Sequence, residues 1–301
     1  MSYAPIALFV YNRPLHTART VAALQQNRLA RESDLVVFSD APKTPEAGSA
    51  VREVREFIAR LDGFKSVRVV ERTENWGLAR SIVDGVTRLT DERQRVIVLE
   101  DDLVTSPHFL EYMNAALDRY QDEERVMQIA GYMYPARPRV DEDALFLPFI
   151  SSWGWATWKR AWRHFAWRDG DFAKVLADPA TKRRFDLNGR YKFSKILRAQ
   201  LRGKVDSWAI HWYVTVFLLE GLSLFPTRTL VHNLGFDGSG VNCFVSKLEQ
   251  GDLDSEFRAT VFPNTIDVSP QAENVMRNIP AVRPSLTAIV KRLSRVIQQH
   301  A

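Results

Sequence analysis

An apolar run ends in three consecutive acids in the sequence VIVLEDDL, residues 96–103. Its β-branched and leucine side chains are typical of a buried strand. Carboxylates are rarely buried unless they are paired or bound to a metal. Glu100, Asp101 and Asp102 therefore indicate a cation site at the carboxyl edge of a sheet, where open α/β sheets bind ligands. The alternative is a solvated loop in which Asp102 caps the next helix.

Strand and helix patterns alternate before this run. Together they predict a βαβαβαβ unit, which by the connection rules is a mainly parallel sheet flanked by helices, with site residues in the loops after the strands. A further helix is expected to begin at Ser106-Pro107 and to run through Tyr120. The predicted strands are residues 6–10, 35–38, 67–70 and 96–99, and the predicted helices are residues 15–26, 51–61 and 78–89.

The pattern changes after Tyr132, where prolines punctuate a loop-rich region that leads into a cluster of aromatic residues. Trp155, Trp158 and Trp162 recur at helical spacing, which predicts a helix that packs into the core. Trp153 and Gly154 precede this predicted helix. They are candidates for a pocket wall, because an indole supplies a rigid apolar face and glycine permits close backbone approach.

Composition excludes several classes of protein. The chain has 301 residues and one cysteine, Cys243, so neither an intramolecular disulfide nor a cysteine-cluster zinc site is possible. No apolar run approaches a membrane span, and the first residues lack the pattern of a secretory signal, so we expect a cytoplasmic protein. A metal would then take oxygen ligands and perhaps histidine.

The net charge of +5 does not indicate nucleic-acid binding. Four of the excess charges lie in the last residues, where Arg283, Lys291, Arg292 and Arg295 have no acidic neighbour. A second basic stretch, residues 182–204, is predicted to be a solvated helix face, and the alternative is a surface that faces phosphates or an anionic membrane.

Five motifs in order carry a family resemblance: FVYNRP at 9–14, SD at 39–40, ENWGLA at 74–79, LEDD at 99–102 and WGW at 153–155. This set resembles nucleotide-sugar glycosyltransferases of the GT-A fold. More narrowly, it is similar to the group around N-acetylglucosaminyltransferase I and its bacterial relatives. The resemblance covers roughly residues 4–242. It implies a Rossmann-like α/β fold with a nucleotide-sugar-binding half (1–131), a smaller acceptor-binding and catalytic half (132–262) and a C-terminal tail (263–301).

The resemblance also implies a metal site. Asp102 would be a direct ligand of Mn²⁺ or Mg²⁺, and His232 could complete the site, although a histidine at a strand end is also a common structural residue. Asp101 and Glu100 would hold sugar or ribose hydroxyls, or metal-bound waters. The cation would stabilise the charge that develops on the leaving diphosphate.

The nucleotide would lie along the same sheet edge. Asp40 would contact the nucleoside, or alternatively form a turn before Ala41-Pro42. Arg80 would reach the diphosphate or the base, or alternatively be a helix-surface arginine. Asn12 and Arg13 follow the first strand and would face the nucleotide, although Pro14 alone also explains a helix start there.

The acceptor side supplies the remaining candidates. Asp206 in KVDSW resembles the acid beside a tryptophan that acts as general base in inverting members, and its alternative role is a helix N-cap. Asp237 would hold acceptor or sugar hydroxyls. Bacterial relatives often place a histidine near Asn242, and this chain does not.

These expectations describe a metal-dependent, inverting glycosyltransferase that uses a nucleoside-diphosphate sugar. Its acceptor would be a hydroxyl of a glycan or a lipid-linked glycan of cell-surface polysaccharide. An apolar and basic helix at residues 285–299 would bind the inner face of the membrane, dock on its own domain or form a homodimer. The rival functions are a nucleotidyltransferase and a catalytically silent glycan-binding protein, and the absence of a glycine-rich loop after the first strand argues against the first of these.

Overall fold

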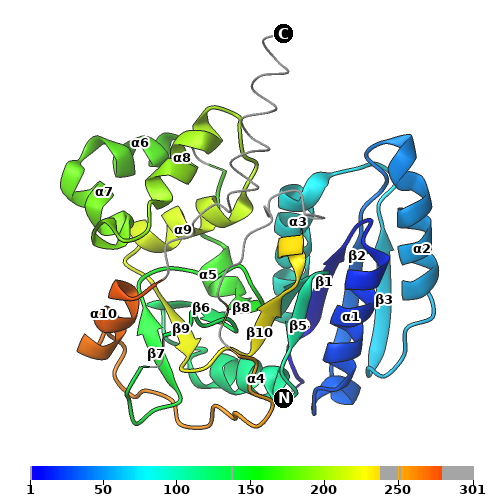
Figure 1. Ribbon diagram of the computed structural model, residues 1–301, viewed down its shortest axis with the longest axis horizontal. Coiled ribbons are helices and arrows are strands. Elements are labelled where there is room, and N and C mark those ends of the chain that lie inside the picture. The colour runs from blue at the N-terminus through cyan, green and yellow to red at the C-terminus, as the bar shows by residue number, and fades with distance from the viewer. Residues whose placement is uncertain (1, 137, 168, 238–249, 251, 280–301) are drawn as a thin grey trace.

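The computed structural model describes residues 2–136, 138–167, 169–237, 250 and 252–279. A large sheet runs through the molecule with helices against it, and a group of further helices, α6, α7 and α8, lies beside α9 at the end away from α1 and α2 (Figure 1). The predicted helix at residues 285–299 lies outside the described residues.

The sheet has eight strands in the order β3-β2-β1-β4-β8-β6-β9-β7. Its first four strands are mutually parallel, as the alternating pattern predicts. The later strands add one parallel pairing, β6 with β9, and three antiparallel ones. In sequence order the strands are β1 (Ile6–Val10), β2 (Asp34–Ser39), β3 (Ser66–Glu71), β4 (Arg95–Glu100), β6 (Val126–Ala130), β7 (Ala144–Leu147), β8 (Trp155–Trp158) and β9 (Leu222–Pro226).

Helices cover both faces of the parallel strands. Ile6, Leu8 and Val10 of β1 pack in one core cluster with α1 (Pro14–Gln25), α2 (Gly48–Ile58) and α4 (Phe109–Arg119). The alternate residues, Ala7 and Phe9, pack in another cluster with α3 (Gly77–Arg93), α5 (Lys159–Trp162) and α9 (Trp208–Leu218). A strand that is buried on both faces has a nearly continuous run of apolar residues, and this pattern is what predicts such strands from the sequence.

The structure corrects two predicted elements. Trp155 and Trp158 lie in strand β8, and only the short helix α5 follows it, so the predicted helix through the tryptophans is wrong. Their burial is nevertheless as expected. Helix α4 begins at Phe109 with His108 as its N-cap, two residues later than predicted, because Ser106 instead accepts a hydrogen bond from the His108 amide (3.2 Å) within the preceding turn.

A small second sheet lies directly after the acidic motif. It pairs β5 (Leu103–Thr105) with β10 (Val231–Asn233) in antiparallel register, with Asn233 opposite Leu103. This pairing brings residues 232–237, more than 120 positions later in the chain, to the end of β4. The acidic motif and the predicted acceptor-side loop are therefore neighbours.

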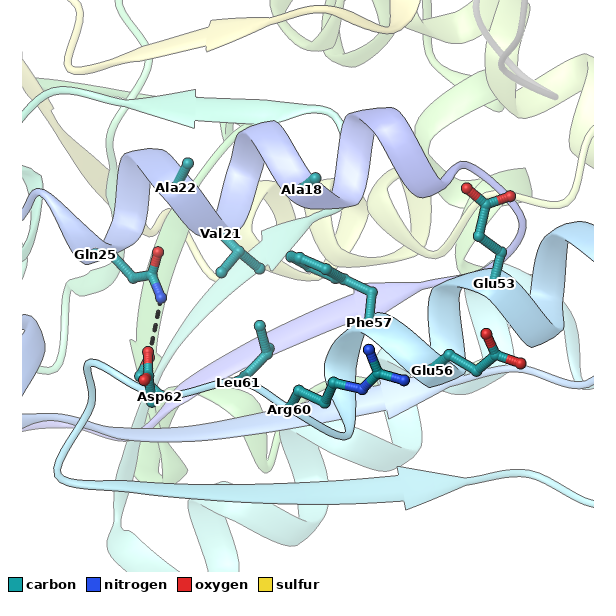
Figure 2. A pocket seen from close by; sticks show the side chains of 10 residues that line it. All are labelled: Ala18, Val21, Ala22, Gln25, Glu53, Glu56, Phe57, Arg60, Leu61 and Asp62. Carbon is teal, nitrogen blue, oxygen red and sulfur yellow. Dashed lines mark hydrogen bonds between the residues drawn. The ribbon is translucent and has the colours of Figure 1, made fainter.

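Helices α1 and α2 leave a surface hollow of about 500 Å³ between them (Figure 2). Val21, Phe57 and Leu61 point into it, and the Gln25 side chain donates to the Asp62 carbonyl oxygen across one end (3.0 Å). The residues that line this hollow include none of the predicted site residues. The hollow is therefore a feature of helix packing, separate from the candidate site.

The remaining helices lie in the second half of the chain and are α6 (Asp169–Ala177), α7 (Pro179–Phe185), α8 (Phe193–Leu201) and α10 (Pro270–Arg277). None of the helices in the described part of the chain has the length and apolar character needed to cross a bilayer.

Gly154 provides a test of this packing, because it has a φ of +59° and a Cβ there would lie 2.8 Å from Val231. We expect Gly154→Ala to lower the free energy of unfolding by about 2 kcal/mol or more, since both the left-handed backbone and the contact oppose a side chain. Gly48→Ala is the matched control, because Gly48 has a φ of −60° and no atom within 4 Å of its Cβ position. Urea unfolding of both variants checks this, and equal stability would contradict the packing described.

Candidate active site

The acidic motif forms a tight turn at the end of β4. Glu100 is the last residue of the strand, and Asp101 and Asp102 are only 3% and 4% exposed. The Arg13 guanidinium, at the end of β1 next to β4, forms a hydrogen-bonded ion pair with Asp101. Its Nη1 forms a second ion pair, with Asp102 Oδ2 at 3.0 Å. Asn12, also after β1, is half-buried.

One guanidinium faces three carboxylates here, and their pKa values reflect this. Burial, followed by the charges of Asp102 and Asp101, raises the pKa of Glu100 to about 8. Burial also raises the pKa of Asp101 to about 6, although Arg13 opposes the shift. Burial disfavours the charged form of Arg13, but the two aspartates reverse this effect and raise its pKa. The turn thus holds more negative charge than its neighbouring arginine neutralises.

Two further side chains of helix α1 contact this turn or the segment after β10. The Thr20 hydroxyl donates to the Asp101 carbonyl oxygen (2.8 Å), and His16 Nε2 lies 3.1 Å from Asp237 Oδ2. Sequence reasoning missed both His16 and Thr20. Their i, i+3, i+7 spacing from Arg13 places the three on one helix face and is the signal that could have found them.

The segment after β10 covers Asp102. The Leu234 amide donates to the Asp102 carbonyl oxygen (2.8 Å), and a Cβ at Gly235 would lie 2.2 Å from Asp102 Oδ2. His232 lies opposite Val104 in the β5–β10 ladder. Within the described residues, no three His, Cys, Asp or Glu side chains form a group that could hold a metal by themselves.

Trp153 and Gly154 lie beside this cover. The Trp153 ring contacts the ring of Phe236 at a centroid distance of 5.4 Å and that of Tyr132 at 4.4 Å. Gly154 approaches Val231 of β10 and Leu99 of β4 closely. The pocket-wall residues predicted from the sequence therefore adjoin the acidic motif.

Asp40 organises the start of α3. Its carboxylate accepts hydrogen bonds from the amides of Ala41, Trp76 and Gly77, each at 2.9 Å, and from the Asn75 side chain at 3.0 Å. A carboxylate has about four acceptor positions, so these donors fill it. Three of these donors belong to residues 75–77, so the carboxylate anchors the NWG motif to the end of β2. This differs from the predicted turn before Ala41-Pro42, because Pro42 has no N–H to close such a turn.

Two arginines lie over the Trp76 ring. The guanidinium carbons of Arg72 and Arg80 are 3.8 and 3.9 Å from its centroid. Arg72 is buried and paired with Asp84. The Arg80 side chain is 61% exposed, and its Nη1 lies 3.9 Å from Glu74 Oε1. Arg80 is thus a surface side chain that stacks on Trp76 near the carboxyl end of β2, where Asp40 holds the Trp76 amide.

Comparison with known families identifies the chain. The model of "Glycosyl transferase family 2" matches residues 6–165, which is more than half of its length and includes the acidic motif and the WGW motif. The chain belongs to glycosyl transferase family 2. It is a nucleotide-sugar glycosyltransferase, and the predicted GT-A fold class, a mostly parallel sheet flanked by helices, is confirmed.

Solved structures give weaker similarities. A mannosyltransferase from Pyrobaculum calidifontis in complex with GDP-Man and Mn²⁺ is 16% identical at a TM-score of 0.40, covering 73% of this chain and 72% of its own. TarS 1-349 from S. aureus is 12% identical at a TM-score of 0.46, covering 77% of this chain and 60% of its own. GalNAc-T7 with UDP, GalNAc and Mn²⁺ is 11% identical at a TM-score of 0.47, covering 75% of this chain and 43% of its own. The chain thus spans less than two thirds of the last two. At these TM-scores we draw no conclusion on substrate or metal.

A search of curated protein sequences finds no match to this glycosyltransferase.

Asp206 lies at the start of α9 in the second half of the glycosyltransferase. The N-cap of α9 is Ser207, so Asp206 does not occupy the capping position that was its alternative role. Asp206 is exposed, and Trp208, two residues later, stacks on Trp155 with a centroid distance of 5.0 Å. This stack fixes the start of α9 against β8, the strand next to β4.

Asp40 yields a prediction that separates its two roles. Replacing it with alanine leaves the amides at the start of α3 without their acceptor, so we expect Asp40→Ala to lower the free energy of unfolding by about 2 kcal/mol in the absence of nucleotide. Glu53→Ala, an exposed acid on α2, should change it by less than about 0.5 kcal/mol. Chemical denaturation measures both. Unchanged stability with weakened nucleotide binding would assign Asp40 to the ligand instead.

Proposed function

We propose that this enzyme is a metal-dependent, inverting glycosyltransferase that moves a sugar from a nucleoside diphosphate to a hydroxyl of a glycan or a lipid-linked glycan. The observation that carries the proposal is the group of carboxylates at the end of β4, where the buried Asp101 and Asp102 share the Arg13 guanidinium and the half-buried Glu100 adjoins them. Such a cluster favours an additional cation. Family 2 membership supplies the class of reaction.

The donor set fits Mn²⁺ or Mg²⁺. Carboxylate oxygens are hard ligands, and an ion held by one or two of them would take its other ligands from substrate phosphates and water. We assign Asp102 as the direct ligand and His232 as a candidate second ligand. When bound, the cation would offset the charge on the leaving diphosphate.

Arg13 supports a diphosphate at the same place. Its guanidinium lies among the carboxylates at the end of β4, and guanidinium groups suit phosphate oxygens. We propose that Arg13 and Asn12 face the diphosphate, that Arg80 reaches the diphosphate or the base, and that Asp101 and Glu100 hold sugar or ribose hydroxyls or metal-bound waters. For Asp40, its four internal hydrogen bonds favour positioning of Trp76 and Arg80 over direct contact with the nucleoside.

On the acceptor side, we propose Asp206 as the general base. An exposed carboxylate is free to accept a proton from an acceptor hydroxyl, and a single displacement with such a base inverts the sugar. Trp153 and Gly154 adjoin the acidic motif, and Asp237 lies 3.1 Å from His16 of α1. All three are proposed to contact sugar rings or hydroxyls. The narrower kinship with the N-acetylglucosaminyltransferase I group is part of this proposal and rests on the five motifs.

Nucleotide release from a panel of UDP, GDP, dTDP and CMP sugars tests the proposal. We expect slow hydrolysis of one donor that requires Mn²⁺ or Mg²⁺ and falls on the order of 100-fold or more in Asp102→Asn, because the cation loses its direct ligand. Asp91→Asn, an exposed acid paired with Lys159, should retain full turnover. Absence of both turnover and metal-dependent nucleotide binding would favour a silent glycan-binding protein. Formation of a nucleoside triphosphate and a sugar 1-phosphate when inorganic pyrophosphate is added would indicate a nucleotidyltransferase.

Asp206→Asn tests the mechanism separately. Loss of a general base should lower turnover roughly 100-fold or more while metal-dependent donor binding is retained. Glu220→Gln, an exposed acid in the same half of the chain, serves as the control and should leave turnover unchanged. The anomeric configuration of the product, read by NMR, decides the stereochemistry, and retention would rule out the inverting assignment.

A further inference from the structure

Within residues 1–279, positive charge is concentrated in one segment, residues 179–207, which contains α7 and α8. This segment carries nine Lys and Arg and two Asp, whereas the other residues up to 279 carry 28 Lys and Arg and 34 Asp and Glu. The segment is therefore strongly basic on an otherwise acidic body. Charge separated in this way creates a field of one sign at the surface that carries it.

The basic side chains of this segment are exposed and largely unpaired. Lys182 is engaged by Asp186 at 2.8 Å. Of the other eight, the described residues provide an acidic partner only for Arg184, which lies 3.7 Å from Glu220. The eight exposed cations, defined here as the basic face, are Arg183, Arg184, Arg190, Lys192, Lys195, Arg198, Arg202 and Lys204.

Helix α8 shows how the basic face is presented. Ser194 and Leu197 are buried, and Leu197 belongs to the core cluster under this helix. Lys195, Arg198 and Arg202 have i, i+3, i+7 spacing, so they share the opposite, solvent-facing side. Leu201, which is 45% exposed, comes three residues after Arg198. An apolar side chain therefore lies among the cations.

A second apolar group adjoins the other end of the basic face. The Arg184 guanidinium lies over the Phe217 ring at 4.9 Å and pairs with Glu220. Leu218 and Leu219, which lie between Phe217 and Glu220 at the end of α9, are 38% and 49% exposed. Cations interspersed with exposed leucines are typical of surfaces that lie on anionic bilayers, whereas a soluble polyanion needs the charge alone.

We infer that the basic face of α7 and α8 binds an anionic membrane surface. This inference depends on charge and exposed leucines and does not require the donor chemistry proposed above. The basic face continues through Lys204 to Asp206, so the bound membrane would adjoin the proposed general base. That placement suits a lipid-linked acceptor, a consequence that does rest on the proposed function.

Co-sedimentation of the full chain with vesicles tests the inference. We expect binding to vesicles of phosphatidylcholine mixed with phosphatidylglycerol, and little binding to phosphatidylcholine alone. The triple variant Lys195→Gln, Arg198→Gln, Arg202→Gln should reduce the partition coefficient on the order of 100-fold, since each cation near an anionic surface contributes severalfold. Leu201→Ser should also weaken binding, without any change in charge.

The matched control replaces three exposed arginines near α1 and on or just after α2: Arg31→Gln, Arg52→Gln and Arg60→Gln. It changes the net charge equally and should leave vesicle binding within a fewfold of wild type. Unfolding transitions and donor turnover confirm that each variant is folded. The inference is overturned if wild type shows no preference for anionic vesicles, or if the control triple loses as much binding. It is also overturned if soluble polyphosphate competes fully while Leu201→Ser binds like wild type, which would identify a soluble polyanion as the partner.

Discussion

The shortage of positive charge at the end of β4 is the constraint on which the site depends. Three consecutive acids stand at the end of a strand whose residues pack on both faces of the sheet, and Asp101 and Asp102 are buried there. Arg13 pairs with two of them, and the pKa of the third, Glu100, rises to about 8. A buried charge without a partner is costly. This is the physical basis of the cation that we propose at this turn.

Several distant segments hold this turn in place. Arg13 and Thr20 reach it from the start of α1, and Leu234 and Gly235 cover it through the β5–β10 ladder. The parallel strands β1 and β4 bring their carboxyl ends together, which places Arg13 beside the acids. On the other side, the stack of Trp208 on Trp155 fixes the start of α9 and with it Asp206. One sheet edge thus gathers the donor and acceptor candidates.

The first half of the fold could be predicted from the sequence because β1, β2 and β4 are continuous apolar runs separated by helical patterns. The tryptophan region misled the same reasoning, since a strand followed by one helical turn also produces the spacing of Trp155, Trp158 and Trp162. At the site, the acidic motif was predicted, but its counter-ion was not, because Arg13 precedes Asp101 by 88 residues. Likewise, the role of Asp40 at the start of α3 exists only once β2 and the NWG motif are brought together.

The most direct test of the central claim is electron paramagnetic resonance of Mn²⁺, because it reports cation binding without turnover. The free Mn²⁺ signal should fall when wild-type protein is added together with the nucleoside diphosphate of the preferred donor, and it should fall much less with Asp102→Asn. Equal loss of the free signal for both proteins would place the cation elsewhere. No loss for either protein would contradict a divalent cation at the end of β4.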